Sequence, residues 1–200
     1  MSRSKPFFTG GYRGFTLIEL LITLVILGVL IVVAAPSFSE IRRNSELSGT
    51  ANNFMSALNA ARTEGMKRNM HAFITPIDGD NDWSKGWRVF VDVDRDGLYS
   101  SGDIVVFQAE APPSYLSVSA GSGSGTAAEN PSYLLFDGSG FAKTKTGGFG
   151  ANTVQISRND VATTEYRQIR RVKVAKTGRV RVCTPQSSSD DACKASGDEG

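Results

Sequence analysis

The chain has 200 residues, of which 40% are hydrophobic and 21% are charged, a composition that allows one hydrophobic core. Its formal net charge of +2 is too small to indicate a polyanion partner by itself. One histidine, His71, and two cysteines offer no zinc or iron–sulfur site and little for a Ser–His or Cys–His nucleophile. We therefore expect a protein that is not an enzyme, and a membrane-anchored periplasmic enzyme is the rival class.

The first feature in chain order is an apolar run of 21 residues from Phe15 to Ala35. A helix of this length spans roughly 30 Å, which is enough for a bilayer. Arg3, Lys5 and Arg13 precede the run with no acid among them, so the positive-inside rule predicts a cytoplasmic N-terminus. We expect residues 15–35 to form a single transmembrane helix in the inner membrane, with the rest of the chain outside the cytoplasm.

One carboxylate, Glu19, interrupts the apolar run five residues after Gly14. A charge at bilayer depth costs about 3 kcal/mol, so this carboxylate needs a partner unless it reaches the membrane interface. The string from Gly14 to Glu19, Gly-Phe-Thr-Leu-Ile-Glu, resembles the class III signal of type IV pilins and pseudopilins. The resemblance implies that a prepilin peptidase removes the cytoplasmic leader 1–14 and methylates the new N-terminus at Phe15. In an apolar filament core, the Phe15 amine can then pair with Glu19 of a neighbouring subunit.

Residues 36–70 continue the helix with an amphipathic pattern. Pro36 falls where pilins of this type commonly carry a helix-bending proline. The apolar positions after it follow helical spacing, with charged residues between them. These positions are Ile41, Leu47, Ala51, Phe54, Met55, Leu58 and Ala61. We expect this half of the helix to pack its apolar stripe beneath a β domain.

Short runs of β-branched and aromatic residues follow Met70, and turn signals separate nearly all of them. Eight strands are predicted over residues 71–77, 86–92, 103–109, 115–120, 133–137, 153–158, 167–175 and 179–183. Closely spaced strands behind one long helix favour an α+β fold, with the N-terminal hydrophobic helix packed on a C-terminal antiparallel β domain. We assign residues 71–183 to this β domain and residues 184–200 to a C-terminal tail.

Two segments of the β domain resemble the GspH/FimT family of minor pilins and pseudopilins. They are the strand Gly86 to Asp92 with the Asp-rich turn after it, and the late string Gly178 to Cys183, Gly-Arg-Val-Arg-Val-Cys. The resemblance covers most of the chain. It implies a type IV pilin-like fold and a non-catalytic subunit that helps to prime assembly of a pilus or of a type II secretion pseudopilus.

The Asp-rich turn has the spacing of a calcium-binding loop. Asp92, Asp94, Asp96, Gly97 and Asp103 occupy positions 1, 3, 5, 6 and 12 of an EF-hand-like pattern, with the Leu98 carbonyl at position 7. Position 12 is Asp where the pattern prefers the longer Glu, and the flanks read as strands. We expect either a Ca²⁺ site or an acidic hairpin turn in which Asp and Gly serve as turn residues.

A basic cluster lies near the end of the chain, with seven Lys and Arg residues and no acid between Arg167 and Arg181. Strand alternation places Arg171 and Lys173 on one face, and Arg179 and Arg181 likewise, so a paired hairpin would form one outward cationic patch. Gly178-Arg179-Val180-Arg181 matches the GRxR motif associated with DNA binding in FimT-type minor pilins. The resemblance implies that Arg179, Arg181, Arg171 and Lys173 bind double-stranded DNA, and a solvated basic face is the alternative.

The two cysteines, Cys183 and Cys193, lie close together in the sequence near the C-terminus. Such a pair suits a small disulfide loop in an oxidising compartment, and a buried reduced pair is the alternative.

These features together predict a minor pilin of a type IV pilus. We expect it to lie first in the inner membrane and then in the extracellular pilus, where it contacts other major and minor pilins. A type II secretion minor pseudopilin of the same fold is the leading alternative. No cofactor other than the candidate Ca²⁺ is expected.

Overall fold

The structure is a computed structural model that describes residues 14–79, 81–120 and 126–195, without the side chains of residues 33–37. The chain divides into two compact units, Met1–Arg43 and Asn44–Gly200. One helix, α1 (Leu17–Arg68), belongs to both units. The helix continues through Pro36. The bend that we expected at this proline stays a prediction. The second unit carries every described strand and is the β domain considered below.

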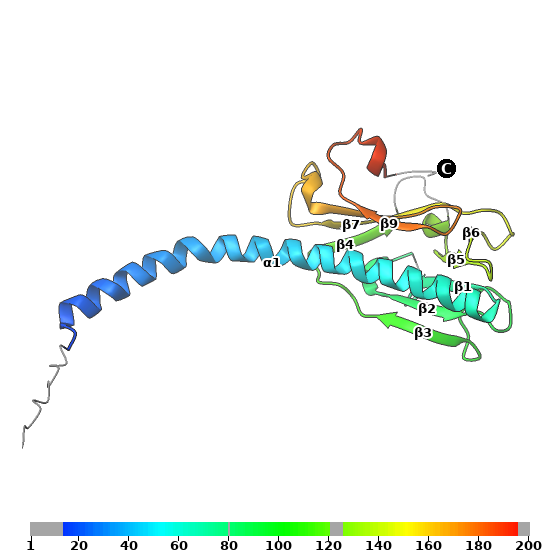
Figure 1. The fold of residues 1–200 in the computed structure, drawn as a ribbon, viewed down its shortest axis with the longest axis horizontal. Coiled ribbons are helices and arrows are strands. Elements are labelled where there is room, and N and C mark those ends of the chain that lie inside the picture. The colour runs from blue at the N-terminus through cyan, green and yellow to red at the C-terminus, as the bar shows by residue number, and fades with distance from the viewer. Residues whose placement is uncertain (1–13, 80, 121–125, 196–200) are drawn as a thin grey trace, which may run out of the picture. The chain divides into compact units, whose positions relative to one another are not determined.

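Within the described residues, nine strands form two antiparallel sheets (Figure 1). The first sheet has the order β3-β2-β1-β5-β6, and the second has the order β4-β7-β8-β9. The strands are β1 (Ala72–Pro76), β2 (Trp87–Val91), β3 (Ile104–Ala109), β4 (Leu116–Ala120), β5 (Leu134–Phe136), β6 (Ala142–Lys143), β7 (Asn152–Arg158), β8 (Ile169–Val174) and β9 (Val180–Cys183). Among the described residues, three short 3-10 helices lie between strands, η1 (Trp83–Lys85), η2 (Thr126–Ala128) and η3 (Tyr166–Gln168), and a fourth, η4 (Asp191–Cys193), follows β9.

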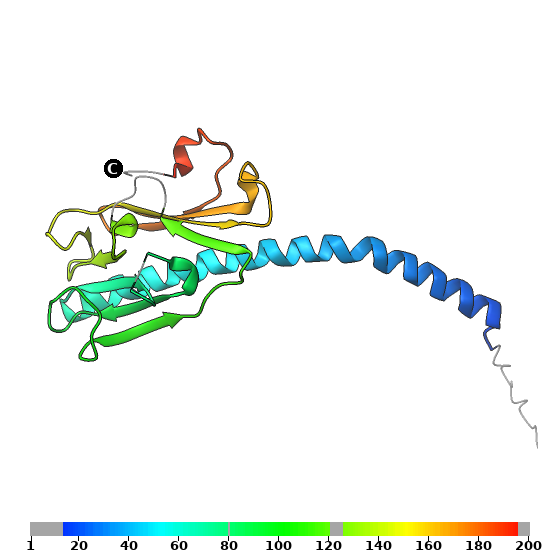
Figure 2. The same ribbon diagram turned by 180° about the vertical axis from the view of Figure 1, so that it is seen from behind.

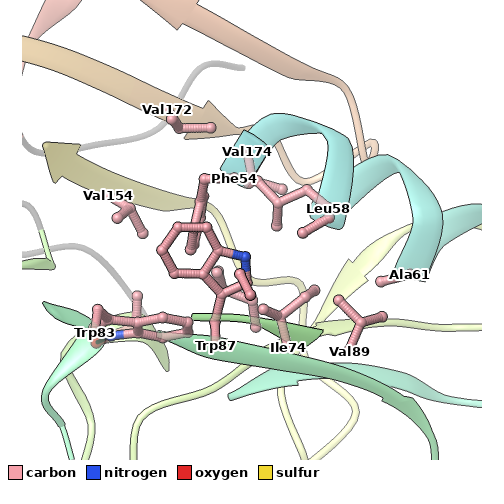
Figure 3. Close-up of a cluster of buried hydrophobic side chains, with 14 of the residues drawn as sticks. Phe54, Leu58, Ala61, Ile74, Trp83, Trp87, Val89, Val154, Val172 and Val174 are labelled. Atoms are coloured by element: carbon pink, nitrogen blue, oxygen red, sulfur yellow. Dashed lines mark hydrogen bonds between the residues drawn. The ribbon is translucent and has the colours of Figure 1, made fainter. Parts of the chain in front are cut away.

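The hydrophobic core lies between the two sheets and the part of α1 that belongs to the β domain (Figures 1 and 2). Phe54 stands at its centre, with its ring 4.9 Å from that of Trp87 and 5.6 Å from that of Trp83. Figure 3 shows valines of the second sheet meeting these aromatic rings from the other side. The buried positions on α1 recur at helical spacing: Leu47, Ala51, Phe54, Leu58 and Ala61.

The expected α+β pilin-like fold is confirmed, and all eight expected strands are present with shifted ends. The sequence reading missed β6, which has only two residues. It also placed Ile41 on the buried stripe, but Ile41 is 66% exposed and precedes the β domain.

Candidate functional site

The predicted processing site lies just before α1. Residues 14–16 precede the helix and are exposed, whereas leader residues 1–13 lie outside the described part of the chain. A Cβ added to Gly14 would have no heavy atom within 4 Å, and no left-handed φ demands glycine there. Neither the local packing nor the backbone conformation therefore requires glycine at position 14.

Glu19 lies in the first turn of α1, and its backbone N–H donates to Thr16 Oγ1 at 3.3 Å. Thr16 thus caps the helix, and the exposed Glu19 carboxylate lies near the positive end of the helix dipole. This position suits a carboxylate even in an isolated chain. The helix dipole does not by itself explain why the apolar run contains the charge of Glu19.

The large apolar side chains from Leu17 to Val32 are each at least 49% exposed. They cover α1 on all sides, and none of the first-unit residues whose side chains are described is buried. The predicted segment 15–35 ends among residues whose side chains lie outside the description. Across the residues that are described, we find no helix with both the length and the apolar character needed to cross a membrane.

The basic hairpin consists of β8, β9 and the turn between them. Its register pairs Lys173 with Arg181 and Arg171 with Cys183. The turn closes through hydrogen bonds from the Ala175 N–H to the Arg179 carbonyl and from the Gly178 N–H to the Ala175 carbonyl. The predicted strand pairing and turn are therefore present.

Gly178, the first residue of the GRxR string, is required by this turn. Its φ is +80°, a conformation that favours glycine. A Cβ at this position would also collide with the carbonyl oxygen of Gly140. That carbonyl also accepts a 2.9 Å hydrogen bond from Arg62 Nε, so the turn packs tightly where α1 contacts the segment after β5.

The prediction that Arg171 and Lys173 are exposed is wrong. They do lie on the face opposite Val172 and Val174, but Arg171 is only 7% exposed and Lys173 only 4%. Arg171 donates to Gln155 Oε1 at 2.9 Å and to the carbonyl oxygen of Cys193. Burial lowers the pKa of both side chains, and for Lys173 the charges of Arg181 and Arg171 lower it further.

The cover over these two residues is the C-terminal segment 184–195. Asp190 caps η4 by accepting hydrogen bonds from the backbone N–H groups of Ala192 and Cys193. The predicted disulfide between Cys183 and Cys193 is confirmed and joins η4 to β9, with 5.9 Å between the Cα atoms. Both views show this red segment on the side of the second sheet that faces away from α1 (Figures 1 and 2).

Arg179 and Arg181 remain accessible at the hairpin. Arg179 is exposed, and Arg181 is partly exposed while donating to the carbonyl oxygen of Ala192. Arg171, Lys173 and Arg181 therefore lie on the paired strands β8 and β9, and Arg179 immediately precedes β9. Of these four predicted DNA-binding residues, only Arg179 and Arg181 can reach a large partner in this conformation.

Two arginines that fix the hairpin were not recognised from the sequence in that role. Arg62 on α1 donates to the Thr177 carbonyl at 3.4 Å, in addition to its bond to Gly140. Arg170 Nη2 donates to Asn44 Oδ1 at 3.1 Å and Ser48 Oγ at 3.2 Å. Such contacts join residues more than 70 positions apart and leave no periodic signal in the sequence.

The acidic loop joins β2 to β3 in the first sheet. It brings carboxylate oxygens of Asp92, Asp94 and Asp96 within 4.8 Å of one another. Asp103, the fourth predicted ligand, is not in this group. Its two oxygens accept hydrogen bonds from the backbone N–H groups of Val93 and Ser100, at 2.9 and 2.7 Å.

One family model and two solved structures relate the chain to known pilins and pseudopilins. The family model described as Prokaryotic N-terminal methylation motif matches residues 10–35. The type IV minor pilin FimU of Pseudomonas aeruginosa strain PAO1 is similar in structure, with 21% identity and a TM-score of 0.51 over 72% of this chain and 95% of that chain. The minor pseudopilin EpsH from the Type 2 Secretion System of Vibrio cholerae has 16% identity and a TM-score of 0.48 over 71% and 99% of the two chains.

The likeness to FimU shows a shared fold. No curated protein matches the chain significantly. The family model described as Type II transport protein GspH matches residues 50–178, which is more than half of the chain. With an N-terminal methylation motif followed by this domain, the chain belongs to the GspH family of minor pilins and pseudopilins.

Proposed function

We propose that the chain is a minor pilin of a type IV pilus. Prepilin peptidase cleaves it after Gly14 and methylates Phe15, and residues 15–35 hold it in the inner membrane until it joins other major and minor pilins. The observation that carries the proposal is the helix over Leu17–Val32, whose apolar side chains are exposed in the single chain and lie within the methylation motif matched over residues 10–35. We assign no catalytic role to it.

The exposed apolar surface of this helix is too extensive for a protein that stays alone in water. A bilayer covers such a surface first, and the helices of neighbouring subunits cover it in a filament. Within a filament of this kind, Glu19 would be an unpaired charge in an apolar medium unless a cation faces it. The amine that cleavage creates at Phe15 supplies that cation.

The test of this role replaces Glu19 by Val. We expect Glu19→Val to leave membrane insertion intact and to reduce incorporation into filaments, because only the contact between subunits is lost. Thr23→Val is the matched control: Thr23 donates to the Leu20 carbonyl within its own helix, so the change removes a polar group but no charge. Pili are sheared from cells and probed for the tagged subunit. Recovery of Glu19→Val at the wild-type level would refute the pairing role.

A type II secretion minor pseudopilin is the second candidate function, because the matching family is described as a type II transport protein. We favour the pilus because of the basic hairpin, at which Arg179 and Arg181 are accessible. Deleting the gene discriminates between the two. Loss of pili with normal protein secretion supports the pilus, and the converse result supports the pseudopilus.

We further propose that Arg179 and Arg181 contact the phosphates of double-stranded DNA during natural transformation. The support is their accessibility at one hairpin and their place in the string Gly178 to Arg181. Tyr166, partly exposed, is the aromatic residue nearest in sequence, so base stacking contributes little and binding depends on phosphates. Purified full-length protein in detergent should retard duplex DNA at low salt, and absence of any retardation there would refute this role.

A further inference from the structure

The acidic loop between β2 and β3 contains a buried carboxylate that the fold does not satisfy. Asp92 is 1% exposed, and its Oδ2 accepts a 3.1 Å hydrogen bond from the Gly97 N–H. Its other oxygen, Oδ1, is buried without a hydrogen-bond partner. A buried carboxylate oxygen without a partner destabilises the fold, because it has lost its hydrogen bonds to water. A bound ligand would remove this cost.

The charges around Asp92 increase this cost. Burial raises the pKa of Asp92, and the carboxylates of Asp94 and Asp103 raise it further, against the lowering effect of the Gly97 and Arg95 N–H groups. The ion pairs found among the described residues do not involve Asp92, Asp94 or Asp96. Among the described residues these three carboxylates thus lie together without an ion pair, although the Lys145 side chain lies close to Gly97 in the same loop.

The loop backbone holds these carboxylates in place. Gly97 has a φ of +73° and Arg95 one of 64°, which turn the chain sharply inside the loop. The Leu98 N–H donates to Asp96 Oδ1 at 2.7 Å, and the Asp96 N–H donates to Asp94 Oδ1 at 3.3 Å. An ordinary acidic turn accounts for these bonds, but it does not account for the buried Oδ1 of Asp92.

We propose that Asp92, Asp94 and Asp96 bind one Ca²⁺ ion, with the buried Oδ1 of Asp92 as a ligand. Oxygens bound to one Ca²⁺ at about 2.4 Å lie at most about 4.8 Å apart, and the three carboxylates meet this limit. The Leu98 carbonyl, at position 7 of the loop pattern, is available as a further oxygen ligand. Asp103 serves instead to close the loop through its bonds to Val93 and Ser100.

Calcium suits this loop better than magnesium. Ca²⁺ accepts irregular sets of oxygen ligands, whereas Mg²⁺ requires near-octahedral geometry at about 2.1 Å and keeps several of its waters. The ion would stabilise the connection between β2 and β3, and β3 is an edge strand of the first sheet.

The test is a titration of full-length protein in detergent after removal of metal with EDTA. Isothermal titration with CaCl₂ should show one ion per chain, and the melting temperature should rise by about 5 °C at saturation, because the ion binds only the folded state. MgCl₂ at equal concentration should give a smaller rise. No heat of binding and flat melting curves up to millimolar CaCl₂ would overturn the proposal.

Two variants and one control separate binding from folding. Asp94→Asn should abolish the calcium-dependent rise. Asp92→Asn should also abolish it, while melting in EDTA at or above the wild-type temperature because a buried charge is gone. Glu110→Gln, at an exposed carboxylate outside the loop, should keep the full rise. An undiminished rise in both loop variants would place the calcium elsewhere and overturn the assignment.

Discussion

The double change Arg179→Gln with Arg181→Gln tests whether the basic hairpin is a DNA-binding surface. Both side chains lie on β9 or at its start and remain accessible, whereas Arg171 and Lys173 are buried beneath the C-terminal segment. We therefore expect the two accessible arginines to supply most of the phosphate contacts that this hairpin makes. Removing them should abolish most DNA binding and lower transformation without changing pilus assembly.

The size of the effect follows from counterion release. Each phosphate contact on duplex DNA contributes about 0.9 to the slope of log affinity against log salt, so losing two contacts should reduce the slope by about 1.8. Between 50 and 200 mM salt, the affinity of the wild-type protein should therefore fall about 12-fold more than that of the double variant.

The assay is fluorescence anisotropy of labelled duplex DNA over this salt range, with full-length protein in detergent. Lys143→Gln with Lys145→Gln is the control of equal charge change. These lysines lie in a different part of the fold, with their Nζ atoms 3.7 Å from the ring centre of Phe149 and 4.8 Å from that of Tyr133.

Folding must be checked separately, because Arg181 also donates to the Ala192 carbonyl. The single change Arg179→Gln avoids that contact and should alone reduce the slope by about 0.9. If the arginine and lysine double variants weaken binding equally, only net charge matters. If neither weakens it, the hairpin does not bind DNA.

Further expectations concern the stability of the β domain. Gly178→Ala should lower the free energy of unfolding by at least about 2 kcal/mol, because it adds a collision with the Gly140 carbonyl to the cost of a positive φ. Gly147→Ala, with a φ of +87° and no heavy atom within 4 Å, should cost only about 1 kcal/mol, and equal losses in urea unfolding would contradict this account. Cys183→Ser with Cys193→Ser should cost about 2 to 3 kcal/mol, because the disulfide closes a loop with a sequence separation of 10. Urea unfolding unchanged by reduction would contradict that estimate.

The fold was largely predictable because its signals are local. The apolar stripe from Leu47 to Ala61 has the helical period, and the residues of β8 and β9 alternate as strands do. The two-residue β6 has no such period, which explains why it was missed. Ile41 was misplaced because helical spacing continues beyond the residues of α1 that belong to the β domain.

The candidate sites were predictable in position but not in exposure. Alternation placed Arg171 and Lys173 on the correct face of the sheet, but the segment that buries them has no periodic pattern. Its place follows from the disulfide and from the Arg171 bond to the Cys193 carbonyl, which are tertiary contacts. In the same way, spacing identified the acidic loop, whereas the burial of Asp92 could come only from the structure.

The central claim is that the chain matures into a filament subunit that begins at Phe15. The most direct measurement is the intact mass of the protein recovered from cells, with Gly14→Ala beside it. The account predicts a wild-type chain that starts at N-methylated Phe15 and a variant that keeps its leader, because position 14 has room for a Cβ and the change leaves the fold intact. A mature N-terminus near Pro36, or normal processing of the variant, would contradict it.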